Sequence, residues 1–245
     1  MLDNSHKTYW VAHRGNCEHH IENTLESVAS AIENGIKHIE IDVQLTQEGL
    51  PVVFHDNNLK VLLGIDKNMA ETSYTRLSKT PLQPRKVNPI NADYFAPLLS
   101  QIVLLIKQHK NITLYVEVKN INFQYFSYQH VYKTIIKTLQ PIINQVVIIS
   151  FSYRILRLVK KNSSTPIAYV LPSWQHYSSK MLKNLQPEII FTDTTIIPTN
   201  ETFHTKKEKW VAYEVSNIKK AKKLITQGIF GLESFTPALL ANKLF

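Results

Sequence analysis

The sequence lacks three features that are typical of secreted or membrane proteins: paired cysteines, a long apolar run and a signal peptide. It has one cysteine, Cys17, in 245 residues, which excludes an internal disulfide framework. No apolar run approaches the ~18 residues that a membrane-spanning helix needs, so no transmembrane segment is expected. The first residues, Met1 to Tyr9, include Asp, Asn, Ser, His and Lys and contain no apolar stretch typical of a secretory signal peptide. We therefore expect a cytoplasmic protein.

Acidic residues are in the minority, since 19 Asp and Glu stand against 28 Lys and Arg and leave a formal charge of +9. This balance favours anionic partners such as phosphate esters, nucleic acid or acidic membrane surfaces, without choosing among them. The chain has no long basic arm, and its short basic clusters are interpreted as solvated helix faces. It also has no recognisable nucleic-acid-binding motif, so a small-molecule phosphate ester is expected and nucleic acid is not.

The chain does contain a regular alternation of short apolar runs and longer amphipathic segments. Apolar residues make up 44% of it, and the runs are rich in Val and Ile, which is typical of buried parallel strands joined by helices. Strands are predicted over residues 8–13, 38–43, 51–55, 112–118, 145–150, 166–171, 188–192 and 210–215, with a further run at 228–232. Helices are predicted over 22–34, 96–109, 128–140, 153–161, 178–185 and 218–227. We therefore predict a single α/β domain over residues 1–245, folded as a TIM-type (β/α) barrel.

Two features make the predicted barrel slightly irregular. Nine apolar runs are one more than a closed eight-stranded barrel needs, and the third begins at Pro51, too close behind Val43 for a crossover of ~10–12 residues. Either this run follows its neighbour without a helix, or the last run is a loop. Residues 57–97, after the third strand, are rich in Asn, Pro, Lys and Thr and are predicted as a short insertion that caps the barrel mouth.

Charged and imidazole side chains gather where the first four predicted strands end, and barrel enzymes carry their catalytic groups at this face. The four groups are His13-Arg14-Gly15, Glu40-Ile41-Asp42, His55-Asp56 and Glu117-Val118-Lys119. Because residues two apart in a strand point to the same side, Glu40 and Asp42 face one way, as do Glu117 and Lys119. Polar side chains on the inward face of a packed barrel need partners there.

Three converging carboxylates without cysteine favour a hard, all-oxygen cation site, which suits Mg²⁺ or Ca²⁺ rather than Zn²⁺. Like charges in one cavity raise each other's pKa, and a divalent cation removes this repulsion and polarises a phosphoryl oxygen. Arg14 and Lys119 add donors for other phosphate oxygens, although Lys119 could also neutralise Glu117 as an ion pair. His13 and His55 can exchange protons near neutral pH. Together these groups predict in-line displacement at a phosphodiester.

The order and spacing of these motifs resemble the glycerophosphodiester phosphodiesterase family. The resemblance is dense over roughly the first quarter of the chain and continues in two later motifs. It rests on His13-Arg14-Gly15, Glu22-Asn23-Thr24-Leu25-Glu26-Ser27, Gly35, Glu40-Ile41-Asp42-Val43, Thr46, Gly49-Leu50-Pro51-Val52-Val53-Phe54-His55-Asp56, Glu117-Val118-Lys119 and Ser150-Phe151. It implies a barrel fold, a Ca²⁺ or Mg²⁺ ion, and the release of glycerol 3-phosphate and an alcohol.

Carried over residue by residue, the resemblance also implies a role for each side chain. His13 and His55 would be the acid–base pair, Glu40, Asp42 and Glu117 the metal ligands, and Arg14 and Lys119 the phosphate contacts. The chain departs from the family near its carboxyl terminus, where Tyr213-Glu214-Val215-Ser216 replaces Trp-Thr-Val-Asn and Ser234-Phe235 replaces Thr-Asp. These positions are expected at the far side of the site, where they would alter substrate preference.

The expected activity is the hydrolysis of deacylated phospholipids such as glycerophosphocholine. One alternative is a phospholipase D-like enzyme that acts on lysophospholipids or sphingolipids, but residues 57–97 offer few apolar side chains for an acyl-chain groove. A second alternative is a non-catalytic glycerophosphodiester-binding protein, which the altered carboxyl-terminal motif permits and the complete set of His, Glu and Asp residues argues against. Water and a neighbouring hydroxyl of the substrate remain alternative nucleophiles.

Overall fold

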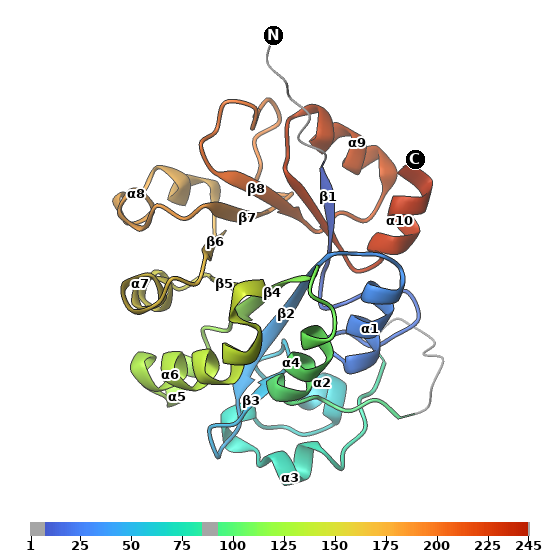
Figure 1. Ribbon diagram of the computed structural model, residues 1–245, viewed down its shortest axis with the longest axis vertical. Helices are drawn as coiled ribbons and strands as arrows, with labels where there is room; N and C mark the ends of the chain where they lie inside the picture. Colours follow the sequence, from blue (N-terminus) through green and yellow to red (C-terminus); the bar gives the residue numbers. More distant parts are fainter. Residues whose placement is uncertain (1–7, 85–92, 245) are drawn as a thin grey trace.

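The structure is a computed structural model that describes residues 8–84 and 93–244, and within these ranges eight parallel strands close into a barrel (Figure 1). The barrel strands are β1 (Tyr9–Ala12), β2 (His38–Leu45), β4 (Thr113–Val118), β5 (Val146–Ser150), β6 (Ile167–Leu171), β7 (Ile189–Asp193), β8 (Lys209–Tyr213) and β9 (Gly231–Ser234). Each strand pairs in parallel with its neighbours, and β9 pairs with β1 to close the ring. The predicted TIM-type barrel is confirmed.

The third predicted run is a strand, but it lies outside the barrel. This strand, β3 (Pro51–Val53), pairs antiparallel with β2, with Val43 opposite Val53. β3 therefore follows β2 directly, with no helix between them, which was one of the two alternatives that the sequence left open. The last run is also a strand, displaced from the predicted 228–232 to β9, because Gly228 at φ 87° still belongs to the end of the preceding helix, where its N–H bonds the carbonyl of Ile225.

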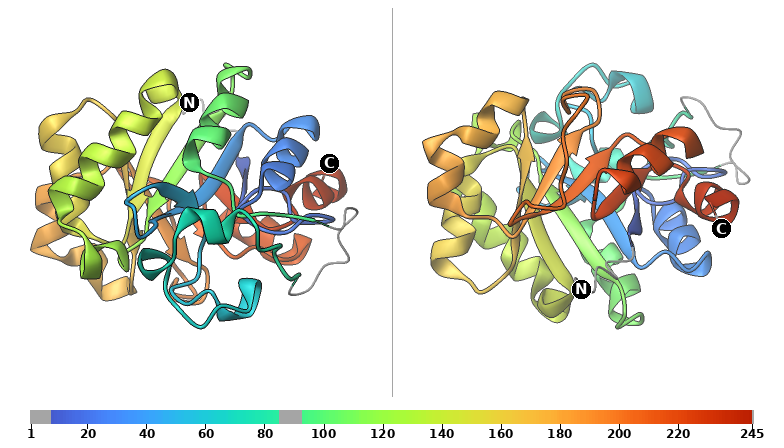
Figure 2. Two further views of the ribbon diagram at one scale, coloured as in Figure 1. Left: turned by 90° about the horizontal axis from the view of Figure 1, so that it is seen from below. Right: turned by 90° about the horizontal axis from the view of Figure 1, so that it is seen from above.

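The helices form an outer layer around the strands (Figure 2). Six were predicted, and the structure has them as α1 (Leu25–Glu33), α4 (Leu99–Lys107), α6 (Tyr128–Leu139), α7 (Tyr153–Asn162), α8 (Lys180–Leu185) and α9 (Ile218–Thr226); α10 (Pro237–Leu244) was not predicted. Shorter turns are α2 (Lys60–Leu63), α3 (Tyr74–Leu77), α5 (Asn122–Tyr125), η1 (Met69–Glu71), η2 (Gln140–Gln145) and η3 (Trp174–Ser178). Within the described ranges, no helix is both long and apolar enough to cross a bilayer.

Alternation along the strands separates two cores. Ile41 and Val118 pack in the large core between the sheet and the helices, whereas Glu40 and Asp42 point the other way, as predicted. A smaller apolar cluster fills the inside of the barrel. Its buried members are Val11, Tyr115, Val147, Ile149, Ala168, Val170, Phe191 and Val211. Because these side chains pack the barrel interior, the polar groups gather at its mouth.

The described part of the predicted insertion, residues 57–84 and 93–97, packs beside β3 (Figure 1). Its described part has an apolar cluster of its own, in which Leu62 and Met69 are buried against Phe54. Asn68 Nδ2 also donates a hydrogen bond to Tyr125 Oη (2.6 Å). Residues 85–92 of the predicted cap lie outside the described residues, as do residues 1–7, for which no signal segment was expected.

Candidate active site

The structure brings the predicted site residues together at the carboxyl ends of the first strands. A cavity of about 110 Å³ is lined in part by His13, Arg14, Glu40, His55, Glu117 and Lys119. The remaining lining residues are Ile149, Phe151, Val170, Phe191, Tyr213 and Glu233. Asp42 lies just behind this lining, 2% exposed, between Glu40 and Glu117. All eight barrel strands, or the residues directly after them, therefore contribute to one small cavity.

Three of these side chains can hold a divalent cation. One carboxylate oxygen each of Glu40, Asp42 and Glu117 lies within 4.8 Å of the others. Glu40 Oε1 is buried and has no hydrogen-bond partner among the residues that the structure describes. Burial and the Asp42 carboxylate raise the pKa of Glu40 well above its ordinary value, and burial also raises the pKa of Glu117. An orphaned oxygen and mutual repulsion fit a hard cation such as Mg²⁺ or Ca²⁺.

Two cations already balance part of this negative charge. Lys119 Nζ lies 2.9 Å from Glu117 Oε1 and 3.2 Å from Asp42 Oδ1, so Lys119 does form an ion pair with Glu117. Arg14 Nη1 lies 2.7 Å from Glu22 Oε1, and its Nε lies 3.1 Å from Asp42 Oδ2. Burial alone would raise the pKa of Asp42, but Lys119 and Arg14 outweigh it and hold that pKa well below its usual range. Both cations also line the cavity, where a phosphate oxygen can reach them.

A tight turn after β1 aims Arg14 at the carboxylates. Arg14 has φ 57° and Gly15 has φ 87°, both in the left-handed region. The turn is fixed from α1, because Ser27 Oγ donates a hydrogen bond to the carbonyl of Arg14 (3.0 Å). The Arg14 N–H in turn donates to Glu40 Oε2 (3.1 Å). The predicted His13-Arg14-Gly15 motif is therefore a turn that packs directly against the first turn of α1.

Gly15→Ala is expected to lower the free energy of unfolding by about 2–4 kcal/mol, because strain at positive φ adds to a clash. A Cβ at Gly15 would lie 2.6 Å from the carbonyl carbon of Ser27, a backbone atom that cannot move aside. Gly35→Ala is the matched control, since Gly35 has φ 76° but no atom within 4 Å of an added Cβ, so it is expected to lose only about 1 kcal/mol. Equal losses in urea unfolding would show that the contact with Ser27 is unimportant.

His13 is held by a carboxylate and an aromatic ring. Its Nδ1 lies 2.8 Å from Glu214 Oε2, and the Phe235 ring stacks on it with the centroids 4.4 Å apart and the planes at 23°. Burial lowers the pKa of His13, the nearby Arg14 acts in the same direction, and Glu214 opposes both. The imidazole is therefore mainly neutral near pH 7. Because Nδ1 is engaged, Nε2 is the ring nitrogen available to a molecule in the cavity.

His55 is fixed mainly through its backbone. Gln44, 1% exposed on β2, donates from Nε2 to the carbonyls of Phe54, His55 and Asp56 at 3.1, 3.0 and 2.8 Å. The imidazole Nδ1 lies 2.9 Å from Asp56 Oδ1. His55 lines the small cavity and also an adjoining open groove of about 450 Å³. Both predicted histidines thus have Nδ1 on a carboxylate, but His55 is the one that borders open space.

Sequence reasoning missed part of the site at the ends of β8 and β9. It expected Glu214 and Phe235 at the far side of the site, where they would alter substrate preference, and did not predict that both contact the imidazole of His13. It also did not predict a role for Glu233, which is 2% exposed. Glu233 lies close to His13 and Glu40, and one ligand atom from each of the three residues lies within 4.8 Å of the other two. A carboxylate directly after an apolar run, at the end of a strand, was the signal that pointed to Glu233.

Glu233→Gln is expected to stabilise the protein as pH rises. Burial and the carboxylates of Glu214 and Glu117 raise the pKa of Glu233 well above 4.5, and its Oε1 has no hydrogen-bond partner within residues 8–84 and 93–244. A carboxyl whose pKa is higher in the folded state stabilises folding below its unfolded pKa, and that stability is lost as pH rises towards the folded pKa. The advantage of the neutral amide should therefore grow by about 1–3 kcal/mol between pH 5 and pH 8. Urea unfolding in EDTA measures this, and a pH-independent difference would contradict it.

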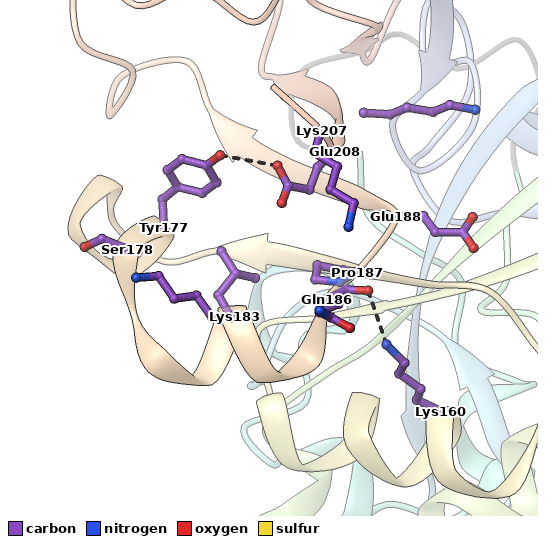
Figure 3. A pocket seen from close by; sticks show the side chains of 11 residues that line it. Lys160, Tyr177, Ser178, Lys183, Gln186, Pro187, Glu188, Lys207 and Glu208 are labelled. Carbon is purple, nitrogen blue, oxygen red and sulfur yellow. Dashed lines mark hydrogen bonds between the residues drawn. The ribbon is translucent and has the colours of Figure 1, made fainter. Parts of the chain in front are cut away.

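A larger groove of about 860 Å³ lies at the opposite, amino-terminal end of β7 and β8. Its charged lining residues are Lys160, Lys183, Lys207, Lys209, Glu188 and Glu208. Lys160 Nζ donates to the carbonyl of Gln186 (3.3 Å) and Tyr177 Oη donates to Glu208 Oε2 (3.3 Å) (Figure 3). Charges of both signs surround this groove, and its described lining includes no histidine. The predicted acid–base and metal-binding residues lie instead around the small cavity at the other end of the barrel.

Comparison with known proteins finds relatives in both sequence and fold. A glycerophosphodiester phosphodiesterase of Bacillus altitudinis is 25% identical over 227 residues, which cover 90% of this chain and 91% of that protein. Glycerophosphodiester phosphodiesterase 1 of Mus musculus is 28% identical over 110 residues, which cover 44% of this chain and 33% of the mouse protein. The fold matches an Oleispira antarctica phosphodiesterase solved in complex with the product sn-glycerol-3-phosphate, with a TM-score of 0.80 and 21% identity over 96% of this chain and 95% of that one.

Fold and comparisons together define a β/α-barrel enzyme of the phosphodiesterase class. The profile of the glycerophosphoryl diester phosphodiesterase family matches residues 13–239, from the first site histidine to the start of α10. The chain belongs to this family. The resemblance seen in the sequence motifs is thereby confirmed over most of the chain.

Proposed function

We propose that the protein hydrolyses glycerophosphodiesters derived from phospholipids, such as glycerophosphocholine, to glycerol 3-phosphate and an alcohol. The observation that carries this proposal is the composition of the small cavity. It joins a carboxylate cluster, two cations and two histidines, each of which has Nδ1 on a carboxylate. Together these groups suit in-line displacement at a phosphodiester.

Glu40, Asp42 and Glu117 would hold a divalent ion, Mg²⁺ or Ca²⁺. When bound, such an ion supplies a Lewis acid beside a phosphoryl oxygen. Arg14 and Lys119 would donate hydrogen bonds to the other phosphate oxygens and orient the phosphorus for in-line attack. Since Asp42 lies behind the cavity lining, its charge also keeps both cations in place.

The two histidines would divide the proton transfers. Nε2 of neutral His13 accepts the proton of the attacking water or substrate hydroxyl as the new P–O bond forms. His55 then donates a proton to the departing alcohol oxygen as the old P–O bond breaks. The assignment of His55 to the leaving group is supported by its place at the open groove. The phosphoglycerol part would occupy the enclosed side and the head group the open side.

The size and lining of these spaces favour a short polar substrate. The cavity of about 110 Å³ is below the ~300 Å³ at which ligand pockets usually begin, so it suits only a small group. The adjoining groove is lined by His55, Asp56, Asn57, Asn58, Val61 and Lys119, which are mostly polar. Such a lining suits a hydrophilic head group better than an acyl chain. The bound sn-glycerol-3-phosphate of the Oleispira antarctica structure supports the same choice.

The test is a substrate panel with a chelator control. Purified protein with Mg²⁺ or Ca²⁺ is incubated with glycerophosphocholine, glycerophosphoethanolamine and lysophosphatidylcholine, and glycerol 3-phosphate and free choline are measured. We expect glycerol 3-phosphate from the two glycerophosphodiesters, and loss of its release in EDTA. Faster choline release from lysophosphatidylcholine would instead indicate a phospholipase D-like enzyme. Binding of glycerophosphocholine without turnover would indicate a binding protein.

A further inference from the structure

Glu214, at the end of β8, uses both oxygens of its carboxylate. Oε2 lies 2.8 Å from His13 Nδ1, and Oε1 accepts a hydrogen bond from the backbone N–H of Phe235 (3.1 Å). The Glu214 carbonyl is itself held by Lys220 Nζ (3.1 Å) and Thr194 Oγ1 (3.4 Å). The carboxylate is therefore fixed relative to both β8 and the loop that follows β9.

Phe235 fixes the same imidazole from another direction. Its ring stacks on His13 with the centroids 4.4 Å apart, while its N–H is the one that anchors Glu214. The backbone N–H of His13 also bonds the carbonyl of Ser234 (2.9 Å). The ring of His13 thus has one face against Phe235 and one nitrogen against Glu214, which restricts rotation about its side-chain bonds.

We propose that Glu214 is a positioning residue that holds His13 in the tautomer protonated at Nδ1, so that the lone pair of Nε2 is directed to the nucleophile. This inference deepens the proposed function and rests on it for the role of His13 as a base. A histidine can accept a proton at Nε2 only if the other ring nitrogen carries the hydrogen. A fixed acceptor beside Nδ1 supplies that condition before substrate binds.

The balance of donors and acceptors makes the proposal testable with an isosteric change. The site has two N–H donors, from His13 and Phe235, and Glu214 offers each its own acceptor oxygen. A glutamine offers one acceptor oxygen and one NH₂ group. If its oxygen accepts from Phe235, its NH₂ faces Nδ1 and favours the tautomer protonated at Nε2. If its oxygen faces His13, the NH₂ meets the N–H of Phe235 and two donors oppose each other.

The experiment compares Glu214→Gln and Glu214→Asp in the full-length, metal-loaded protein. Long-range proton–nitrogen NMR spectra of protein labelled with ¹⁵N-histidine report which ring nitrogen of His13 carries hydrogen, with His13→Asn identifying the signals. Steady-state kinetics with glycerophosphocholine give kcat and KM. Glu208→Gln is the matched control, because Glu208 accepts a hydrogen bond from Tyr177 at the opposite end of the barrel.

Wild type, Glu208→Gln and Glu214→Asp should show His13 protonated at Nδ1, whereas Glu214→Gln should shift hydrogen to Nε2. Glu214→Gln should also lower kcat by roughly 10²–10⁴-fold with a much smaller change in KM. An unchanged tautomer in Glu214→Gln would overturn the proposal, and so would a kcat within about threefold of wild type. Because the tautomer is read without substrate, failure of the proposed activity would not be mistaken for failure of this inference.

Discussion

His13→Asn and His55→Asn are each expected to lower kcat for glycerophosphocholine by roughly 10²–10⁴-fold, which is the usual effect of losing a general acid or base. Asparagine is chosen because its side-chain NH₂ can replace the Nδ1–H group and keep the bond to Glu214 or Asp56. What each substitution removes is Nε2. Because the carboxylate partners stay satisfied, both variants should unfold at nearly the wild-type urea concentration.

The two losses should differ when the leaving group changes. A glycerophosphodiester of p-nitrophenol has a leaving group that departs without protonation, so the loss in His55→Asn should shrink to less than about tenfold. The loss in His13→Asn should stay at its full size, because the attacking water or hydroxyl still has to give up its proton. If both variants respond equally to the leaving group, the division between base and acid is wrong. Near wild-type turnover of glycerophosphocholine in either variant would contradict its catalytic role altogether.

The sequence predicted the barrel and the first half of the site because both depend on local patterns. Val- and Ile-rich runs define the strands, and polar residues at their ends stand out against that background. Glu40 and Asp42 flank an isoleucine that packs in the outer core, so a period of two placed both carboxylates on the inner face. The sequence also restricted where β3 could lie, because the connection between β2 and β3 is too short to contain a helix.

The contacts of His13 could not be predicted in the same way. His13 and Glu214 are 201 positions apart, and they meet because β9 pairs with β1 and β8 pairs with β9. The register that places Ala12 beside Ser234 sets where Phe235 stacks. Closure of the barrel thus decides these neighbours, whereas motif spacing along the chain does not. The departures from the family pattern at Glu214 and Phe235 were expected to alter substrate preference. In the structure both residues contact the imidazole of His13.

Removal of divalent cations is expected to abolish activity and also to lower stability. Within the cavity the carboxylates of Glu40, Asp42 and Glu117 outnumber the adjacent cations Arg14 and Lys119, so a bound ion relieves repulsion that the folded chain otherwise retains. Mg²⁺ or Ca²⁺ at about 100 times its Kd should raise the free energy of unfolding by about 2.7 kcal/mol. Thermal unfolding in EDTA and in each ion measures this gain without substrate.

Glu40→Gln separates ion binding from folding. The amide keeps the shape of the side chain but is a weaker ligand, so the ion-dependent gain in stability should largely disappear. Activity should fall by roughly 10²–10⁴-fold, the equivalent of several kcal/mol of transition-state stabilisation. In EDTA, however, Glu40→Gln should be at least as stable as wild type, because burial and Asp42 raise the pKa of Glu40 and make its charge unfavourable. Glu208→Gln should keep the whole ion-dependent gain, and an equal gain in Glu40→Gln would place the ion elsewhere.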